Sequence, residues 1–238
     1  MINIYNKNYS ENGEDGVIEY LLSQCTDLNY KCLEIGVYDG IQCNTANLVK
    51  NKGYNGVFID RYINFNHKFY DACNYRFINE QVESDNIYSI CKNYNLEYQY
   101  DVFSLDIDSI DYWILKELID KDLFNSHVIV LEYQDIIGPE KSLTVPNLKN
   151  FNASNYDCYD GPNFSGASLQ AFIKLLKNRY VFVGCESLGY NGFFLNKNQL
   201  KSKDMEMKNI KPCFEIEKVK YGMSYRWPRT KDMPWVEV

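Results

Sequence analysis

Short apolar runs alternate with segments of helical periodicity over most of this chain. The apolar runs have the length and composition of buried strands; they are 31–37, 56–60, 75–79, 101–107, 127–133, 179–184 and 192–195. The segments between them place apolar residues on one helical face; they are 43–52, 65–73, 85–94, 111–121 and 166–177, with a further helix near 17–22 capped by Ser10 or Asn12. This alternation predicts an α/β fold, in which a mostly parallel seven-stranded sheet carries helices on both faces.

The pattern is lost in two places. Residues 134–163 have no clear period and contain several glycines and prolines. Because a long irregular segment in a compact domain is usually functional, we expect it to cover a ligand. Residues 201–238 are polar at first and then rich in aromatic residues. We therefore predict one domain, 1–200, with a C-terminal extension, 201–238, packed on it, and the aromatic tail leads us to expect a homodimer.

Charge and composition exclude several classes of partner. The 238 residues carry a net charge of −7, whereas nucleic acids and anionic membranes are bound through basic faces. No apolar run approaches the ~20 residues of a membrane helix, and residues 1–15 lack the apolar region of a signal peptide. We therefore expect a cytoplasmic protein. Its eight cysteines match no zinc spacing, and we expect them to be reduced, buried thiols rather than a disulfide framework.

The first predicted strand ends in an acidic run that contains glycine, Glu34 to Gly40. Its glycines let the backbone approach a ligand closely, but the spacing is not the G-x-G-x-x-G of dinucleotide sites. Asp60 ends the second predicted strand, where an acid can accept both ribose hydroxyls of an adenosine. Glu34 and Asp39 would repel a pyrophosphate, so the two motifs together favour a simpler adenosine ligand. A plain strand–turn–helix with a turn glycine is the alternative.

Further carboxylates follow the fourth and fifth predicted strands. Asp106 and Asp108 end the fourth strand, and Glu132 and Gln134 end the fifth. Carboxylates at such a position are costly unless they are solvated, paired or bound to a cation. Neighbouring strand ends would bring these oxygens together as ligands for Mg²⁺ or Mn²⁺, and hydrogen bonding to loops is the alternative. Asp106 or Asp108 is also the best candidate for a general base.

Several motifs together resemble a bacterial family of Rossmann-like class I methyltransferases, related to the FkbM-type and sugar O-methyltransferases. The matching runs, in chain order, are 10–20 (SENGEDGVIEY), 34–40, Asn44-Thr45 with Leu48, 56–60, 104–113 (SLDIDSIDYW), 132–146 (EYQDIIGPEKSLTVP), 166–169 (GASL) and 183–194 (VGCESLGYNGFF). The likeness spans about residues 10–195. Members of this family act on different acceptors.

The resemblance implies S-adenosylmethionine (SAM) as the cofactor and assigns residues to its parts. The implied cofactor residues are Glu34, Gly36, Asp39, Gly40 and Asn44 near methionine and ribose, Asp60 and Arg61 at the ribose, and Glu80 and Gln81 at adenine. Asp106 and Asp108 would face the methyl-transfer cleft, and Asp106, Glu132 and Gln134 would hold a metal ion. Gln134 replaces the expected Asn, which leaves the metal open, and Ser109-Ile110 replaces the expected Gly-Asn.

The expected activity is methyl transfer to a hydroxyl of a sugar or nucleotide-linked sugar, as in surface-polysaccharide biosynthesis. Tyr133, Tyr156 and Tyr159 are the candidate acceptor residues, because tyrosine rings stack on sugar or base faces. The alternatives are a nicotinamide-dependent oxidoreductase, which the missing third glycine and Glu34 disfavour, and a non-catalytic Rossmann-like binding domain.

Overall fold

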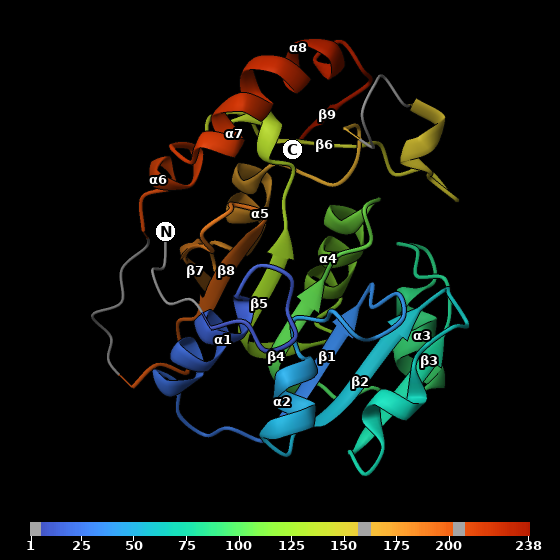
Figure 1. Cartoon of the computed structure of the whole chain (residues 1–238). Helices are drawn as coiled ribbons and strands as arrows, with labels where there is room; N and C mark the ends of the chain where they lie inside the picture. Colours follow the sequence, from blue (N-terminus) through green and yellow to red (C-terminus); the bar gives the residue numbers. More distant parts are fainter. Residues whose placement is uncertain (1–5, 157–162, 202–207) are drawn as a thin grey trace.

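A seven-stranded sheet forms the centre of the computed structural model, which describes residues 6–156, 163–201 and 208–238 (Figure 1). Its strands are β1 (Lys31–Ile35), β2 (Asn55–Asp60), β3 (Tyr75–Asn79), β4 (Gln99–Leu105), β5 (Asn125–Glu132), β7 (Tyr180–Cys185) and β8 (Asn191–Asn196). Their order is β3-β2-β1-β4-β5-β8-β7, and β8 runs in the direction opposite to the other strands of this sheet. The mostly parallel α/β fold is therefore confirmed, and the strand order is that of the Rossmann-like class I methyltransferase fold.

Helices cover both faces of the sheet. Val17, Ile18 and Leu21 of α1 (Glu14–Ser23) pack with α2 (Ala46–Asn51) in the core of one face. On the other face lie α3 (Ile87–Asn93), α4 (Asp111–Asp120) and α5 (Leu169–Leu176). Alternate strand residues point to opposite faces, so each strand supplies both cores. Within the described residues, no helix combines the length and apolar character needed to cross a membrane.

Two local predictions were wrong. Residues 65–73 contain only a short 3-10 helix, His67–Tyr70, because the rings of Phe65 and Tyr70 stack on each other 5.3 Å apart against the sheet. The first helix is preceded by Gly13 at φ 88° rather than being capped by Ser10 or Asn12. Ser10 instead binds the carboxylate of Asp15, which also accepts the N–H groups of residues 8 to 10 and folds the chain back over the helix start.

The C-terminal segment consists of short elements beyond the arrowhead of β5 (Figure 1). They are α6 (Lys211–Phe214), α7 (Glu217–Tyr221), a π-helical turn (Gly222–Arg226), α8 (Trp227–Thr230) and β9 (Val236–Glu237). β9 pairs antiparallel with β6 (Leu143–Thr144). The π-helical turn and α7 contact the 3-10 helix Asp135–Ile137, which follows β5. The end of the chain thus lies against the irregular segment that follows β5.

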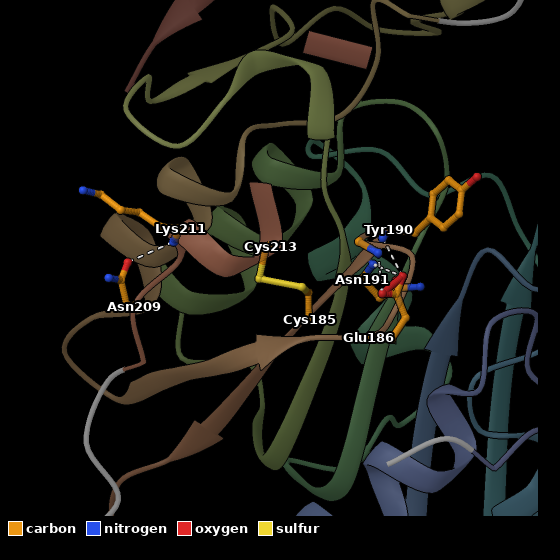
Figure 2. Close-up of a disulfide and its surroundings, with 8 residues drawn as sticks. Cys185, Glu186, Tyr190, Asn191, Asn209, Lys211 and Cys213 are labelled. Carbon is orange, nitrogen blue, oxygen red and sulfur yellow. Dashed lines mark hydrogen bonds between the residues drawn. A yellow bond between two sulfur atoms is a disulfide. The ribbon is translucent and has the colours of Figure 1, made fainter. Parts of the chain in front are cut away.

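The expectation of reduced cysteines was wrong for one pair. Cys185, at the end of β7, and Cys213, in α6, form a disulfide with their Cα atoms 6.0 Å apart (Figure 2). Both side chains are buried. Among the other described cysteines, Cys25, Cys32 and Cys43 are buried free thiols. A spacing of 28 residues between the partners does not reveal the bond, because α6 reaches β7 only through the tertiary fold.

We expect Gly36→Ala to destabilise the fold strongly. Gly36 has φ 91°, and an added Cβ would lie 1.5 Å from the Asp106 carbonyl oxygen, so steric overlap adds to backbone strain of about 1–3 kcal/mol. Gly53→Ala is the matched control, because Gly53 has φ 73° and no heavy atom within 4 Å of an added Cβ. Urea unfolding of both variants measures the difference, and equal losses would contradict the contact.

Reduction of the Cys185–Cys213 bond should lower the free energy of unfolding by about 3.5 kcal/mol, as expected for a loop of this length. Thermal unfolding with and without dithiothreitol measures this. Cys213→Ser should be less stable and insensitive to the reductant, whereas Cys91→Ser, which alters a free cysteine, should keep the sensitivity. Absence of a peptide pair joined through these two residues in a non-reducing digest would refute the bond.

Candidate active site

A cavity of about 850 Å³ opens at the edge of the sheet where the parallel strands end. The residues that follow β1, β2, β3, β4 and β5 all contribute to its wall. Ligands of open α/β sheets bind at this edge. Among the described residues that line the cavity, ten carry a carboxyl group and one, Arg61, carries a positive charge. A cationic or neutral polar ligand suits such a wall better than an anion.

Glu34 organises the loop after β1. Its carboxylate is buried and accepts the N–H groups of Asn44 and Thr45, both at 2.8 Å, and the Thr45 hydroxyl at 2.6 Å. Burial raises the pKa of Glu34 to about 7. The Asn44 side chain donates to the Ser104 hydroxyl on β4 at 3.0 Å. Glu34 and Asn44 therefore line the cavity while holding its β1 and β4 walls together.

The predicted glycines have different roles. Gly36 lines the cavity, whereas an added Cβ on Gly40 would lie 2.4 Å from the Phe65 ring. The Gly40 carbonyl accepts the Tyr70 hydroxyl at 2.6 Å. Gly40 therefore supports the loop from the aromatic cluster behind it, and Asp39 from the same loop lines the cavity and accepts the Ile41 N–H.

Asp60 lies at the end of β2, as predicted, and lines the cavity. Its carboxylate accepts the N–H groups of Tyr38 at 2.7 Å and Tyr62 at 2.8 Å. Both oxygens keep a further lone pair for a ligand hydroxyl. Arg61 also lines the cavity, with its guanidinium 5.0 Å from the centroid of the Tyr62 ring. The ribose contact predicted for Asp60 and Arg61 stays a prediction.

Glu80 and Gln81 follow β3 and line the far end of the cavity. Glu80 accepts the Tyr94 hydroxyl at 2.8 Å, and the Gln81 amide donates to Glu83 at 2.6 Å. Glu83, which the sequence analysis missed, also lines this end and accepts the Asn150 N–H at 3.1 Å. It therefore connects the cavity to the irregular segment after β5.

Three carboxylates meet at the ends of β4 and β5. One oxygen from each of Asp106, Asp108 and Glu132 lies within 4.8 Å of the others. Burial, and then the neighbouring Asp108, raise the pKa of Asp106, and burial with the Asp106 charge raises the pKa of Glu132. Both carboxyl groups therefore favour the protonated form more than a solvated carboxyl group does. These donors also fit Mg²⁺ or Mn²⁺, which prefer carboxylate oxygens.

Gln134, the third predicted metal ligand, contacts Ser165. Its amide nitrogen is 3.4 Å from the carbonyl oxygen and 3.3 Å from the hydroxyl of Ser165. Gln134 lines a second, smaller cavity beside the first. Asp108 joins the predicted metal ligands Asp106 and Glu132 in the group of three carboxylates, and Gln134 stays a prediction.

The candidate acceptor tyrosines are dispersed. Tyr133 lines the second cavity, and its ring packs 6.0 Å from Phe214 of the C-terminal segment. Tyr156 stacks on Phe151 at 5.4 Å, and Phe151 itself lines the first cavity. Tyr159 lies outside the described residues.

Sequence reasoning missed one wall of the first cavity, which comes from both halves of the chain. Glu14 of α1 and Asn191 of β8 line it, and the Asn191 amide donates to Glu14 at 3.0 Å. Asn191 follows a hairpin turn in which Glu186 accepts three backbone N–H groups, those of residues 189 to 191 (Figure 2). The short turn between the last two predicted strands implies an antiparallel pair, and that signal places residues 186–191 at the ligand edge.

Comparisons with known proteins support the fold. No protein-family model matches the chain, and no curated protein is significantly similar to it. Among solved structures, a candidate hemolysin from Lactococcus lactis is 13% identical with a TM-score of 0.51, over 88% of this chain and 98% of that chain. An O-methyltransferase from Bacillus cereus, solved with S-adenosylhomocysteine (SAH), is 16% identical with a TM-score of 0.40, over 81% and 83%. A SAM-dependent methyltransferase from Archaeoglobus fulgidus is 13% identical with a TM-score of 0.39, over 89% and 86%. At 13% identity, the likeness to the first of these structures concerns the fold alone.

Glu186 should make the unliganded protein less stable as pH rises. Burial raises its pKa to about 7 from a reference value of 4.5. A raised pKa means that the folded state favours the protonated form, so this stabilisation is present below about pH 4.5 and is lost as pH rises through about 7. Between pH 5 and pH 8, the melting temperature of Glu186→Gln should fall less than that of the native protein, by roughly a few °C. Equal decreases in the two proteins would rule out this contribution.

Proposed function

We propose that this protein is a SAM-dependent O-methyltransferase that acts on a hydroxyl of a sugar or nucleotide-linked sugar. The observation that carries the proposal is the continuity of the first cavity. Asp60, which would accept the ribose hydroxyls, lines the same cavity as the carboxylates of Asp106, Asp108 and Glu132. A nucleoside-type site is thus adjacent to groups able to accept a proton.

The charge of the cavity favours SAM over a nicotinamide dinucleotide. SAM carries a sulfonium cation, whereas a dinucleotide carries a pyrophosphate. Ten carboxyl groups and one arginine line the cavity, so its field attracts the first and repels the second. Asp60 would face the ribose of SAM. Glu34 and Asp39 would face the methionine part, and Glu80 and Gln81 would face the adenine.

Bound SAM would supply an electrophilic methyl group, and the protein supplies position and proton transfer. The cavity wall would hold the acceptor hydroxyl oxygen in line with the methyl carbon, and such positioning provides much of the rate. The carbon–oxygen bond forms as the carbon–sulfur bond breaks, and SAH leaves as a neutral thioether. The hydroxyl proton passes to a carboxylate of the Asp106–Glu132 pair, whose raised pKa suits a general base. If Asp106, Asp108 and Glu132 instead held a divalent ion, that ion would lower the pKa of the hydroxyl, and the pair would not act as the base.

The sugar class rests on the polar character of the second cavity. Amide, hydroxyl and carboxyl side chains dominate its wall, and such groups recognise hydroxyl-rich ligands better than apolar ones. We also propose that the protein is cytoplasmic and takes part in surface-polysaccharide synthesis.

Titration calorimetry of SAH into the purified protein, with Mg²⁺ and with EDTA, tests the cofactor. We expect micromolar binding that weakens at least tenfold in Asp60→Ala, because that variant removes the ribose acceptor. The control is Asp122→Asn, at a surface carboxylate paired with Arg179, which should bind as the native protein does. Absence of binding in both conditions would overturn the proposal.

Asp106→Asn should retain the fold and SAH binding but lose turnover by roughly 10²–10⁴-fold, the usual contribution of a general base. SAM consumption with a panel of sugars and nucleotide sugars measures turnover. Undiminished activity in this variant would exclude Asp106 from proton transfer.

A further inference from the structure

A second cavity of about 180 Å³ adjoins the first. Asp108, Glu132 and Tyr190 line both, so the two cavities meet at the proposed reaction centre. At about 30 Å³ per water molecule, the smaller cavity has room for about six waters, which is the scale of a single monosaccharide ring.

The C-terminal segment builds one wall of this second cavity. Arg226, from the π-helical turn, lines it and donates to both carboxylate oxygens of Asp135 at 2.9 and 3.0 Å. The same guanidinium donates to the Asn163 side-chain oxygen at 3.3 Å. Two nitrogens of the guanidinium are therefore held, Nη2 by Asp135 and Nη1 by Asn163. Arg226 is thus held rigidly by two residues that line the same cavity.

A second cation of the segment supports this wall. Lys218 of α7 lies 3.2 Å from an Asp135 oxygen, and its ammonium lies over the Tyr190 ring. In Figure 2 the Tyr190 side chain projects from the β7–β8 hairpin, away from the disulfide. Because Tyr190 lines both cavities, the C-terminal segment positions the residue between them.

The charge around the second cavity disfavours a phosphorylated ligand. Four carboxylates line this cavity, those of Asp108, Asp111, Glu132 and Asp135, and the carboxylate of Asp106 borders it. In the described chain, the cations in contact with these carboxylates are Arg226 and Lys218. Even with a divalent ion bound to the group of three carboxylates, the surroundings would keep a net negative charge. Hydroxyls and amines find acceptors here, and a phosphate is repelled.

We propose that the second cavity is the acceptor subsite and that Arg226 of the C-terminal segment is a specificity-determining residue within it. This cavity admits one uncharged or amino-bearing sugar ring and excludes a phosphorylated one. This inference rests on the proposed function, because a ligand of this cavity is a methyl acceptor only if the protein is a methyltransferase. A phosphate of any nucleotide-linked acceptor would lie outside this cavity.

Gly222 offers a way to displace Arg226 without removing its charge. Its backbone is helical, at φ −56° and ψ −48°, so alanine meets no conformational strain. An added Cβ would lie 2.6 Å from the Arg226 Nη2 and 3.1 Å from Ile136. Gly222→Ala therefore forces the guanidinium to shift, and Arg226→Ala removes it. The control is Arg229→Ala, because Arg229 belongs to the same segment and stacks on Tyr225 at 3.7 Å.

Saturation-transfer NMR on the full chain, saturated with SAH, tests the subsite in Mg²⁺ and in EDTA. The probes are methyl β-D-glucopyranoside, D-glucosamine and D-glucose 1-phosphate. We expect signals from the first two and none from the third in either condition. Both signals should fall at least fivefold in Arg226→Ala and in Gly222→Ala and stay unchanged in Arg229→Ala. SAH affinity, measured by calorimetry, should be the same in all three variants.

Three results would overturn the proposal: an equal signal from the phosphorylated probe, unchanged signals in Arg226→Ala, or no signal from any probe. Failure of the native chain to bind SAH would instead remove the methyltransferase proposal. The probe experiment would then be run on the unliganded chain, where the same signals and the same variants still decide whether the cavity binds sugar.

Discussion

The close approach of the ends of β1 and β4 is the constraint on which the rest of the site depends. The Gly36 N–H donates to the Ile59 carbonyl on one side, and the Asp106 N–H donates to the Ile35 carbonyl on the other. Only a residue without Cβ fits between them, at φ 91°. This contact lets the chain leave β1 as the loop that contains Asp39, and it holds Asp106 beside that loop. The side of the cavity lined by Asp39 and the side lined by Asp106 are adjacent for this reason.

The site concentrates negative charge, and the fold tolerates it in different ways. Glu34 and Asp60 are held by backbone N–H groups, which replace the hydration that burial removes. Asp106 and Glu132 have raised pKa values because burial disfavours their charged forms. Asp135 alone among these is neutralised by cations, those of Lys218 and Arg226. The carboxylates without cations face the first cavity, so a cationic ligand or metal ion would relieve their repulsion.

Segments from both ends of the chain complete the walls. Glu14 reaches the first cavity from α1, and Arg226 reaches the second from the C-terminal segment. The disulfide joins α6 to β7, next to the hairpin that carries Tyr190 and Asn191. The parallel strands supply the chemistry at their ends, whereas these added segments define the shape of the space around it. Variation in such segments is how one fold serves different acceptors.

The sequence by itself determined the α/β fold, the strands, and the acids at their ends, because these follow from local periodicity and from where parallel strands end. β3 was predicted with the bounds 75–79 that it has, and Asp60, Asp106 and Glu132 lie at strand ends as expected. The tertiary structure alone decided that Cys185 meets Cys213 and that Arg226 lines a cavity. Each of these depends on contacts between residues distant in sequence or on the path of an irregular loop, and neither leaves a periodic signal along the chain.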